Sequence, residues 1–270
     1  MLFVGNKPPS ISSNAYLGVL KKKFRVKKLG YSGTLDPFAS GSLVIASGNL
    51  TKIFNHINLS PKVYIATLWL GAKSPSLDIS LVNKVDIIEE FSKEKILSIL
   101  DSMLGKIVYT PPKFSAKKIN GKRAYSLARD GEYFNLRECE MDILDIKFLS
   151  YNHPFLSFEV SVSKGAYVRS IGEIIANKLG VSGVLSNLIR IREGDFYFQS
   201  YKMLNPLDFI RYKQLNLKNL YDDFKNGKKI ILKGLNKNTR YKVVFDDFFS
   251  IIQVDTFGNI EYIVNRICLC

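Results

Sequence analysis

The chain has few of the residues that build metal centres and histidine-dependent catalytic sites. Among its 270 residues only three are cysteine and two are histidine. The cysteines, Cys139, Cys268 and Cys270, have neither a paired metal-ligand spacing nor an even disulfide framework. His56 and His153 stand apart from each other and from any Ser or Cys nucleophile pattern, and two isolated histidines do not make a zinc site. Acid–base chemistry therefore falls to Asp, Glu, Lys, Arg or Tyr.

Long apolar runs are also missing, as are a P-loop and a dinucleotide-binding fingerprint. The longest apolar stretches fall short of a membrane span and are interrupted by Lys and Arg. The segment from Met1 to Lys7 lacks the charged start and apolar core of a signal peptide. We therefore expect a cytoplasmic protein with no membrane partner.

Acidic residues are scarce relative to basic ones. The chain carries 39 Lys and Arg against 24 Asp and Glu, a net charge of +15. This excess favours a polyanionic partner such as nucleic acid, although a solvated basic surface would give the same number. The basic residues are spread along the chain, so any nucleic-acid footprint must be assembled by folding.

Hydrophobic patterns predict an α+β fold around a mostly antiparallel, mixed sheet flanked by helices. We expect helices at 12–24, 49–58, 93–104, 123–130, 166–179 and after Pro206, and an irregular basic loop at 105–121. Strands are expected at 43–46, 62–71, 139–150, 155–163, 184–192 and 195–200. The composition shifts near Asn226, which predicts a domain of residues 1–225 and a small β-rich module of residues 226–270. The module's strand candidates are 229–232, 241–245, 250–254 and 261–265.

The most informative segment is the glycine-rich stretch from Gly30 to Gly41, which places the single acidic residue Asp36 in a loop of small side chains. Gly30, Gly33 and Gly41 allow backbone angles and close approaches that other residues resist. Pro37 fixes its own φ and disfavours helix at Asp36, so the carboxylate sits at a defined corner. A tight turn would use the same residue types.

The literal sequence of this loop resembles the active-site motif of the bacterial tRNA pseudouridine-55 synthases, the TruB family. Four further segments match motifs of that family in the same order. They are Asn6-Lys7-Pro8-Pro9-Ser10-Ile11-Ser12-Ser13, Pro111-Pro112-Lys113-Phe114-Ser115-Ala116 with Asn120-Gly121-Lys122-Arg123-Ala124-Tyr125, Ser163-Lys164-Gly165-Ala166-Tyr167-Val168-Arg169-Ser170, and Leu185-Ser186-Asn187-Leu188-Ile189-Arg190 before Gly194-Asp195-Phe196. Together they span residues 4 to 198. The C-terminal module resembles a shortened PUA-type RNA-binding domain.

The resemblance implies roles for individual residues. Asp36 is the expected catalytic carboxylate, and Arg169 is the guanidinium expected beside it, opposing the rise in its pKa that a closed pocket causes. Tyr64 is expected to stack on the target base, with Tyr167 and Leu188 lining the pocket. Lys7, Lys22, Lys52, Lys113, Lys117, Lys122 and Arg123 could neutralise phosphates as sequence-independent positioning contacts, and Lys62 is expected among the substrate-binding residues.

Several positions depart from the family pattern. In the first motif Asn6 and Ser10 replace the usual Asp and Gly. Tyr31 stands where the family has a histidine that fills space vacated in the RNA loop, and a tyrosine can also stack and hydrogen-bond. After Gly71 the sequence runs Ala72-Lys73-Ser74-Pro75-Ser76-Leu77-Asp78, which keeps Asp78, an expected substrate-binding residue, but replaces an acidic residue by Pro75.

The resemblance implies isomerisation of the T-loop uridine at tRNA position 55, acting on a flipped-out nucleotide of the T arm, with no cofactor. We expect a monomer without an obligatory protein partner. Three alternatives are a non-catalytic RNA-binding protein on the same scaffold, a synthase with another uridine target or a guide RNA, and an unrelated DNA-binding protein. The pairing of Asp36 with Arg169 and Tyr64 argues against a pure binder.

Overall fold

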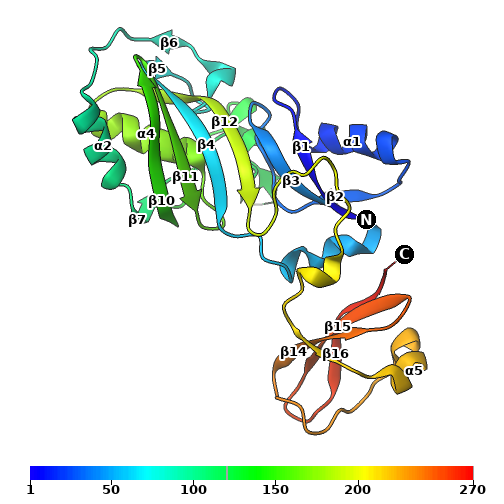
Figure 1. Ribbon diagram of the computed structural model, residues 1–270. Coiled ribbons are helices and arrows are strands. Elements are labelled where there is room, and N and C mark those ends of the chain that lie inside the picture. The colour runs from blue at the N-terminus through cyan, green and yellow to red at the C-terminus, as the bar shows by residue number, and fades with distance from the viewer. Residues whose placement is uncertain (120, 270) are drawn as a thin grey trace.

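The computed structural model describes residues 1–119 and 121–269, so Asn120 and Cys270 lie outside the described residues. It has a large α+β unit built on one long sheet and a smaller β-rich unit at the C-terminal end (Figure 1). This confirms the predicted fold class. No described helix is both long enough and apolar enough to cross a membrane.

The large sheet is antiparallel except at one junction, which lies beside the Asp36 loop. Its strands follow the order β1-β3-β12-β4-β11-β10-β7, and β2 also pairs with β3. Their bounds are β1 Leu2–Lys7, β2 Leu29–Tyr31, β3 Ser40–Ser47, β4 Lys62–Leu70, β7 Gly105–Tyr109, β10 Cys139–Asn152, β11 Phe155–Val162 and β12 Gly183–Glu193. The parallel junction joins β3 to β12 through Ser40 with Ile189 and Gly41 with Arg190.

Three helices of the large unit follow the sequence signals closely. Helix α1 (Ser13–Phe24) begins after Ser12, whose hydroxyl accepts a hydrogen bond from the Ala15 amide at 3.1 Å. Helix α2 (Lys93–Asp101) is capped in the same way by Ser92. Helix α4 (Val168–Leu179) ends at Gly180, which adopts the left-handed conformation that glycine permits. Helix α4 packs on the central strands β12 and β4, and α2 packs against β10 and α4 nearer the edge of the sheet (Figure 1).

Several predicted elements differ from the observed ones. Residues 105–109 form the edge strand β7 instead of part of a loop, because β10 is long enough to pair with them. Residues 195–200 form no strand beyond a single bridge to Phe196, and the predicted helix at 49–58 is the 3-10 helix η1 (Gly48–Asn55). The helix after Pro206 is one 3-10 turn (Pro206–Asp208), and the short helix α3 spans Ala124–Arg129. The two-residue strands β5 (Ala72–Lys73), β6 (Lys84–Val85), β8 (Lys118–Ile119) and β9 (Lys122–Arg123) and the 3-10 turn η2 (Ile79–Leu81) complete the unit.

The C-terminal unit is a four-stranded sheet in the order β13-β14-β15-β16. The strands are β13 (Lys213–Leu215), β14 (Thr239–Val244), β15 (Phe248–Val254) and β16 (Ile260–Cys268), with the 3-10 turn η4 (Lys218–Leu220) and helix α5 (Tyr221–Asn226) before β14. The strand expected at 229–232 contributes only a bridge at Ile231. Because β13 pairs with β14, the predicted boundary at residue 226 falls inside this unit, and we propose a boundary near residue 212 instead.

Candidate active site

Asp36 lies in the tight loop that connects β2 to β3. The Ala39 amide donates to the Asp36 carbonyl at 3.1 Å, which closes a turn across Pro37. Ser13, at the start of α1, ties this loop down: its hydroxyl donates to the Leu35 carbonyl and accepts from the Leu35 amide, both at 3.0 Å. The Asp36 side chain keeps 30% of its surface exposed, so it can meet a ligand.

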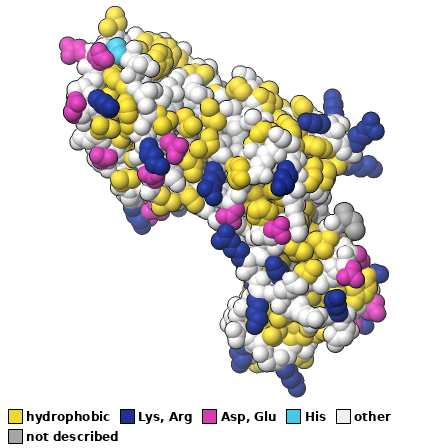
Figure 2. All heavy atoms as spheres, in the orientation of Figure 1, with side chains coloured by type: hydrophobic (Ala, Val, Ile, Leu, Met, Phe, Trp, Pro, Cys, Tyr) yellow, Lys and Arg dark blue, Asp and Glu magenta, His cyan; other side chains and the backbone are white. Residues whose placement is uncertain are grey.

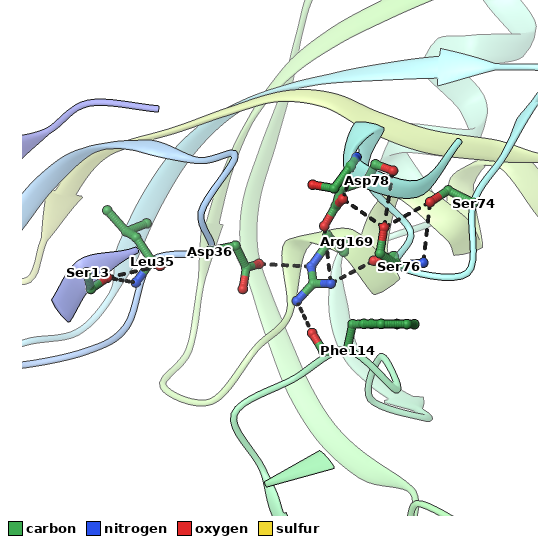
Figure 3. A network of polar contacts seen from close by, with 9 residues as sticks. Ser13, Leu35, Asp36, Ser74, Ser76, Asp78, Phe114 and Arg169 are labelled. Atoms are coloured by element: carbon green, nitrogen blue, oxygen red, sulfur yellow. Dashed lines mark hydrogen bonds and ion pairs between the residues drawn. The ribbon is translucent and has the colours of Figure 1, made fainter. Parts of the chain in front are cut away.

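Arg169, at the start of α4, meets this carboxylate from the opposite side. Its Nε lies 2.8 Å from Asp36 Oδ2, and only 2% of the arginine side chain is exposed (Figure 3). Asp36 and Arg169 lie far apart in the sequence, and the folding of the sheet brings these two predicted partners into contact. An arginine buried beside a carboxylate fixes both its charge and its orientation.

The rest of the Arg169 guanidinium is fully engaged. Nη1 donates to the Ser76 carbonyl at 2.6 Å and lies 3.4 Å from Asp78 Oδ2. Nη2 donates to the Phe114 carbonyl at 3.0 Å. Asp78 is itself held by the Ser76 hydroxyl at 2.8 Å and the Ser80 amide at 2.9 Å. Asp78 is therefore buried behind the arginine, with its carboxylate facing the guanidinium (Figure 3).

The electrostatics of Asp36 are set by two opposing effects. Burial raises the pKa of its carboxyl above the ordinary value, because the charged form loses hydration. The Arg169 guanidinium opposes this and lowers the pKa, while the nearby Asp78 charge raises it. Arg169 thus favours the ionised carboxylate that a nucleophile or base must supply.

Lys7 is placed differently from the sequence expectation. It is fully buried, and its ammonium donates to the carbonyls of Pro8, Ile11 and Pro37 at 2.8, 2.8 and 3.2 Å. Burial lowers its pKa to about 8, although the Asp36 charge pulls the pKa upward. All three donors are used, which leaves the predicted phosphate contact without support. Lys7 holds the carbonyl next to Asp36 and is a positioning residue.

A buried ionic cluster supports the other side of the loop. Arg190, on β12, donates to the Gly33 carbonyl at 3.0 Å and to the Ser42 carbonyl at 2.8 Å, so it spans both ends of the loop. Glu193 is fully buried and lies 3.4 Å from Arg190 and 3.0 Å from Lys62. The Lys62 ammonium therefore faces an internal carboxylate, which leaves its predicted substrate-binding role without support.

The predicted pocket residues gather around this centre. Tyr64 and Leu188 belong to the same buried cluster as Leu35, with 7% and 4% of their surfaces exposed. Base stacking on Tyr64 therefore requires the side chains around its ring to adjust. Tyr167, directly before α4, is half-buried, and its ring centroid lies 6.4 Å from that of Tyr109. The hydroxyl of Tyr109 donates to the Gly165 carbonyl, which braces the turn leading to Arg169.

The remaining predicted residues lie outside this centre. Tyr31 is half-buried on β2 and packs against the cluster of Phe3 and Leu17 under α1. Lys52 is exposed on η1. No role was predicted from the sequence for Ser13, Arg190 or Glu193. Ser13 and Arg190 stand in matched motifs, but only their hydrogen bonds in the fold show that they hold the Asp36 loop.

No group of three His, Cys, Asp or Glu side chains that could hold a metal ion occurs within the described part of the chain.

The part of the chain that bears Asp36 also matches a known protein family. Residues 21–168 match the family model described as TruB family pseudouridylate synthase (N terminal domain). A protein of Helicobacter hepaticus named tRNA pseudouridine synthase B is 54% identical over 99% of this chain and 95% of its own length. The protein of the same name from Campylobacter jejuni is 46% identical over 100% of this chain and 99% of its own length.

Solved structures share the fold at much lower identity. A chain from a Cbf5-Nop10-Gar1 complex aligns with a TM-score of 0.65 and 19% identity over 94% of this chain and 79% of its own length. A chain from an H/ACA RNP bound to a substrate RNA containing 2′-deoxyuridine gives a TM-score of 0.66 and 17% identity, covering 100% of this chain and 85% of its own length. At these identities the likeness concerns the fold alone. The family-model match and the relatives at 46% and 54% identity together show that the chain belongs to the TruB family of pseudouridylate synthases.

Proposed function

We propose that this protein converts uridine to pseudouridine at position 55 in the T loop of tRNA, with Asp36 as its catalytic residue. The observation that carries the proposal is the carboxylate of Asp36, 30% exposed and held 2.8 Å from a buried guanidinium on a loop fixed from both sides. A protein that only binds RNA has no need for this arrangement.

The reaction needs positioning and charge control instead of an external reagent. The N1–C1′ bond of the uridine breaks, the uracil rotates, and a C5–C1′ bond forms; C5 loses a proton and N1 gains one, so atoms and electrons balance. Asp36 acts on the flipped nucleotide as nucleophile or base, and Arg169 holds it ionised and aligned. We propose no cofactor for this isomerisation.

The remaining site assignments support binding of the flipped base. Flipping costs roughly a few kcal/mol, and stacking on an aromatic ring returns about 1–3 kcal/mol. We assign this stacking to Tyr64, the pocket wall to Tyr167 and Leu188, and space filling within the RNA loop to Tyr31. Asp78 positions Arg169, and Lys52 contacts phosphate. We further propose that the protein acts as a cytoplasmic monomer, with its C-terminal unit as a reduced PUA-like RNA-binding domain.

The test is tritium release from tRNA carrying [5-³H]uridine, comparing wild type with Asp36→Asn and mapping the modified base. Release by wild type alone, at one T-loop position and without added RNA, is the expected result. Tight binding without release would replace catalysis by a binding role. Equal release by both proteins would remove the role of Asp36, and release only in the presence of a second RNA would favour a guided synthase.

A further inference from the structure

The amino-terminal part of the chain is almost free of acid. Residues 1–77 contain ten Lys and Arg but a single acidic residue, Asp36 itself. This segment therefore carries +9 of the net charge of +15 in little more than a quarter of the length. The charge is concentrated where β1, α1, β2, β3 and η1 come together.

Most of these cations gather at the far end of α1, in what we call the α1-end cluster: Lys22, Lys23, Arg25, Lys27, Lys28 and Lys52. All six are exposed. The Gly48 amide donates to the Lys28 carbonyl at 3.1 Å, which joins the start of η1, the helix that bears Lys52, to the segment after α1. Figure 2 shows Lys and Arg side chains projecting from the end of the molecule where Figure 1 places α1.

The cluster has no acidic partner among the described residues, because none of the ion pairs in residues 1–119 and 121–269 includes any of the six. Lysines in the last turn of a helix are favoured by the helix dipole, which accounts for Lys22 and Lys23. It does not account for Lys27, Lys28 and Lys52, which lie beyond that helix. Arg25 occupies a left-handed position at φ 53°, where glycine is the low-cost residue.

The position of the cluster relative to Asp36 indicates the shape of its ligand. The first turn of α1 is attached to the Asp36 loop through the two Ser13–Leu35 hydrogen bonds. The helix then runs twelve residues, so its far end lies about 18 Å away at 1.5 Å per residue. An anion that reaches both places is therefore an extended polyanion and not a single nucleotide.

We propose that the α1-end cluster is a second docking surface that binds the phosphate backbone of the substrate tRNA, one length of α1 or about 18 Å from the Asp36 loop. The inference rests on the proposed function for the identity of the RNA. Lysines and arginines of this kind hold the backbone in register without reading its sequence. The cluster then sets affinity and orientation, while Asp36 and Arg169 perform the chemistry.

The test compares two triple variants of the full-length chain with equal change in net charge. One carries Lys22→Gln, Lys27→Gln and Lys28→Gln; Lys23 is left in place because its ammonium sits 3.9 Å from the Tyr201 ring. The matched control carries Lys93→Gln, Lys95→Gln and Lys178→Gln, which are exposed on α2 and at the end of α4. Lys93 and Lys95 lie 5.3 and 4.8 Å from the Phe148 and Phe91 rings, longer contacts than that of Lys23, and the melting check covers their loss. Binding of unmodified tRNA is measured over a series of salt concentrations, with thermal melting as the check on folding and tritium release measured in parallel.

The expected result is that the α1-end variant loses about tenfold or more in affinity near 0.1 M salt, with the slope of log affinity against log salt reduced by about two to three. Its KM for tRNA rises while kcat at saturation stays unchanged, and the control variant behaves as wild type. Equal losses in both variants would mean that only the overall charge matters and would overturn the proposal, as would no loss in either. Binding does not require turnover, so a protein that binds tRNA without isomerising it would refute the proposed function and leave this test valid.

Discussion

At the scale of single residues, Arg169 connects the Asp36 carboxylate, which we propose to be catalytic, to the scaffold. One guanidinium meets Asp36, Asp78 and two backbone carbonyls, and a lysine ammonium cannot reach all four in a fixed plane. We expect Arg169→Lys to lower kcat on the order of 10²–10³-fold with a small change in KM, because an aligned charge is lost and tRNA contacts stay. Single-turnover kinetics with tRNA checks this, with Arg211→Lys, an exposed ion-pair arginine, as control. A change confined to KM would contradict it.

The pKa of Asp36 gives a prediction on stability. Because burial raises this pKa in the folded state, the fold favours the protonated form, and that contribution is lost as pH rises through the folded pKa. At neutral pH the ionised carboxylate therefore opposes folding. Asp36→Asn should raise the melting temperature at pH 7 to 8, with a gain that shrinks as the pH falls toward 4.

Melting curves of wild type and Asp36→Asn at several pH values provide the measurement. A variant less stable than wild type at every pH would show that the ion pair to Arg169 outweighs the cost of burial. In the expected case the protein gives up stability to keep an ionised group at its site, a known compromise of active sites.

At the same scale, the sequence predicted which charged residues belong to the site better than it predicted which groups surround them. The pairing of Asp36 with Arg169 followed from matched motifs, since residue types at a reactive centre are set by chemistry. The roles of Lys7 and Lys62 did not follow, because a lysine looks the same in sequence whether its ammonium faces solvent or an internal carbonyl or carboxylate. Only the folded sheet shows that the buried carboxylate of Glu193 forms an ion pair with Lys62.

At the scale of elements, the parallel junction of β3 and β12 depends on one glycine. Gly41 has φ 106°, and a Cβ there would lie 2.3 Å from the Arg190 carbonyl oxygen. Gly48 has φ 54° with open space around it, so it provides a control for backbone strain alone. We expect Gly48→Ala to cost about 1–2 kcal/mol of unfolding free energy and Gly41→Ala clearly more, with lost activity, because the clash displaces the strand that ends the Asp36 loop.

Urea unfolding of the two variants distinguishes strain from clash. Equal costs would mean that β12 moves aside without penalty and that the close approach is unimportant.

Elements with local signals, such as the serine caps of α1 and α2 and the glycine end of α4, were predictable from sequence. Strand β7 was not, because its residues pair only when β10 lies alongside.

At the scale of the whole molecule, the two units share a hydrophobic cluster. Leu2, Val4 and Val44 of the large sheet pack in one core with Phe249 and Ile251 of β15. Lys242, on β14, donates to the carbonyls of Leu207 and Ile210 in the connecting segment at 3.1 and 3.0 Å. A flexibly attached RNA-binding module would not bury this surface, so we expect the two units to unfold together.

The chain contains a single tryptophan, Trp69 on β4, which makes this cooperativity measurable. Its fluorescence reports the large unit alone, whereas far-UV circular dichroism reports both, so coincident midpoints are expected in wild type. Phe249→Ala removes a fully buried side chain from the shared core and should cost about 3–5 kcal/mol. Because both units share this hydrophobic core, the unfolding transition reported by Trp69 should shift to lower denaturant, although Phe249 belongs to the C-terminal unit. A shift seen by circular dichroism but not by Trp69 would mean that the units fold independently.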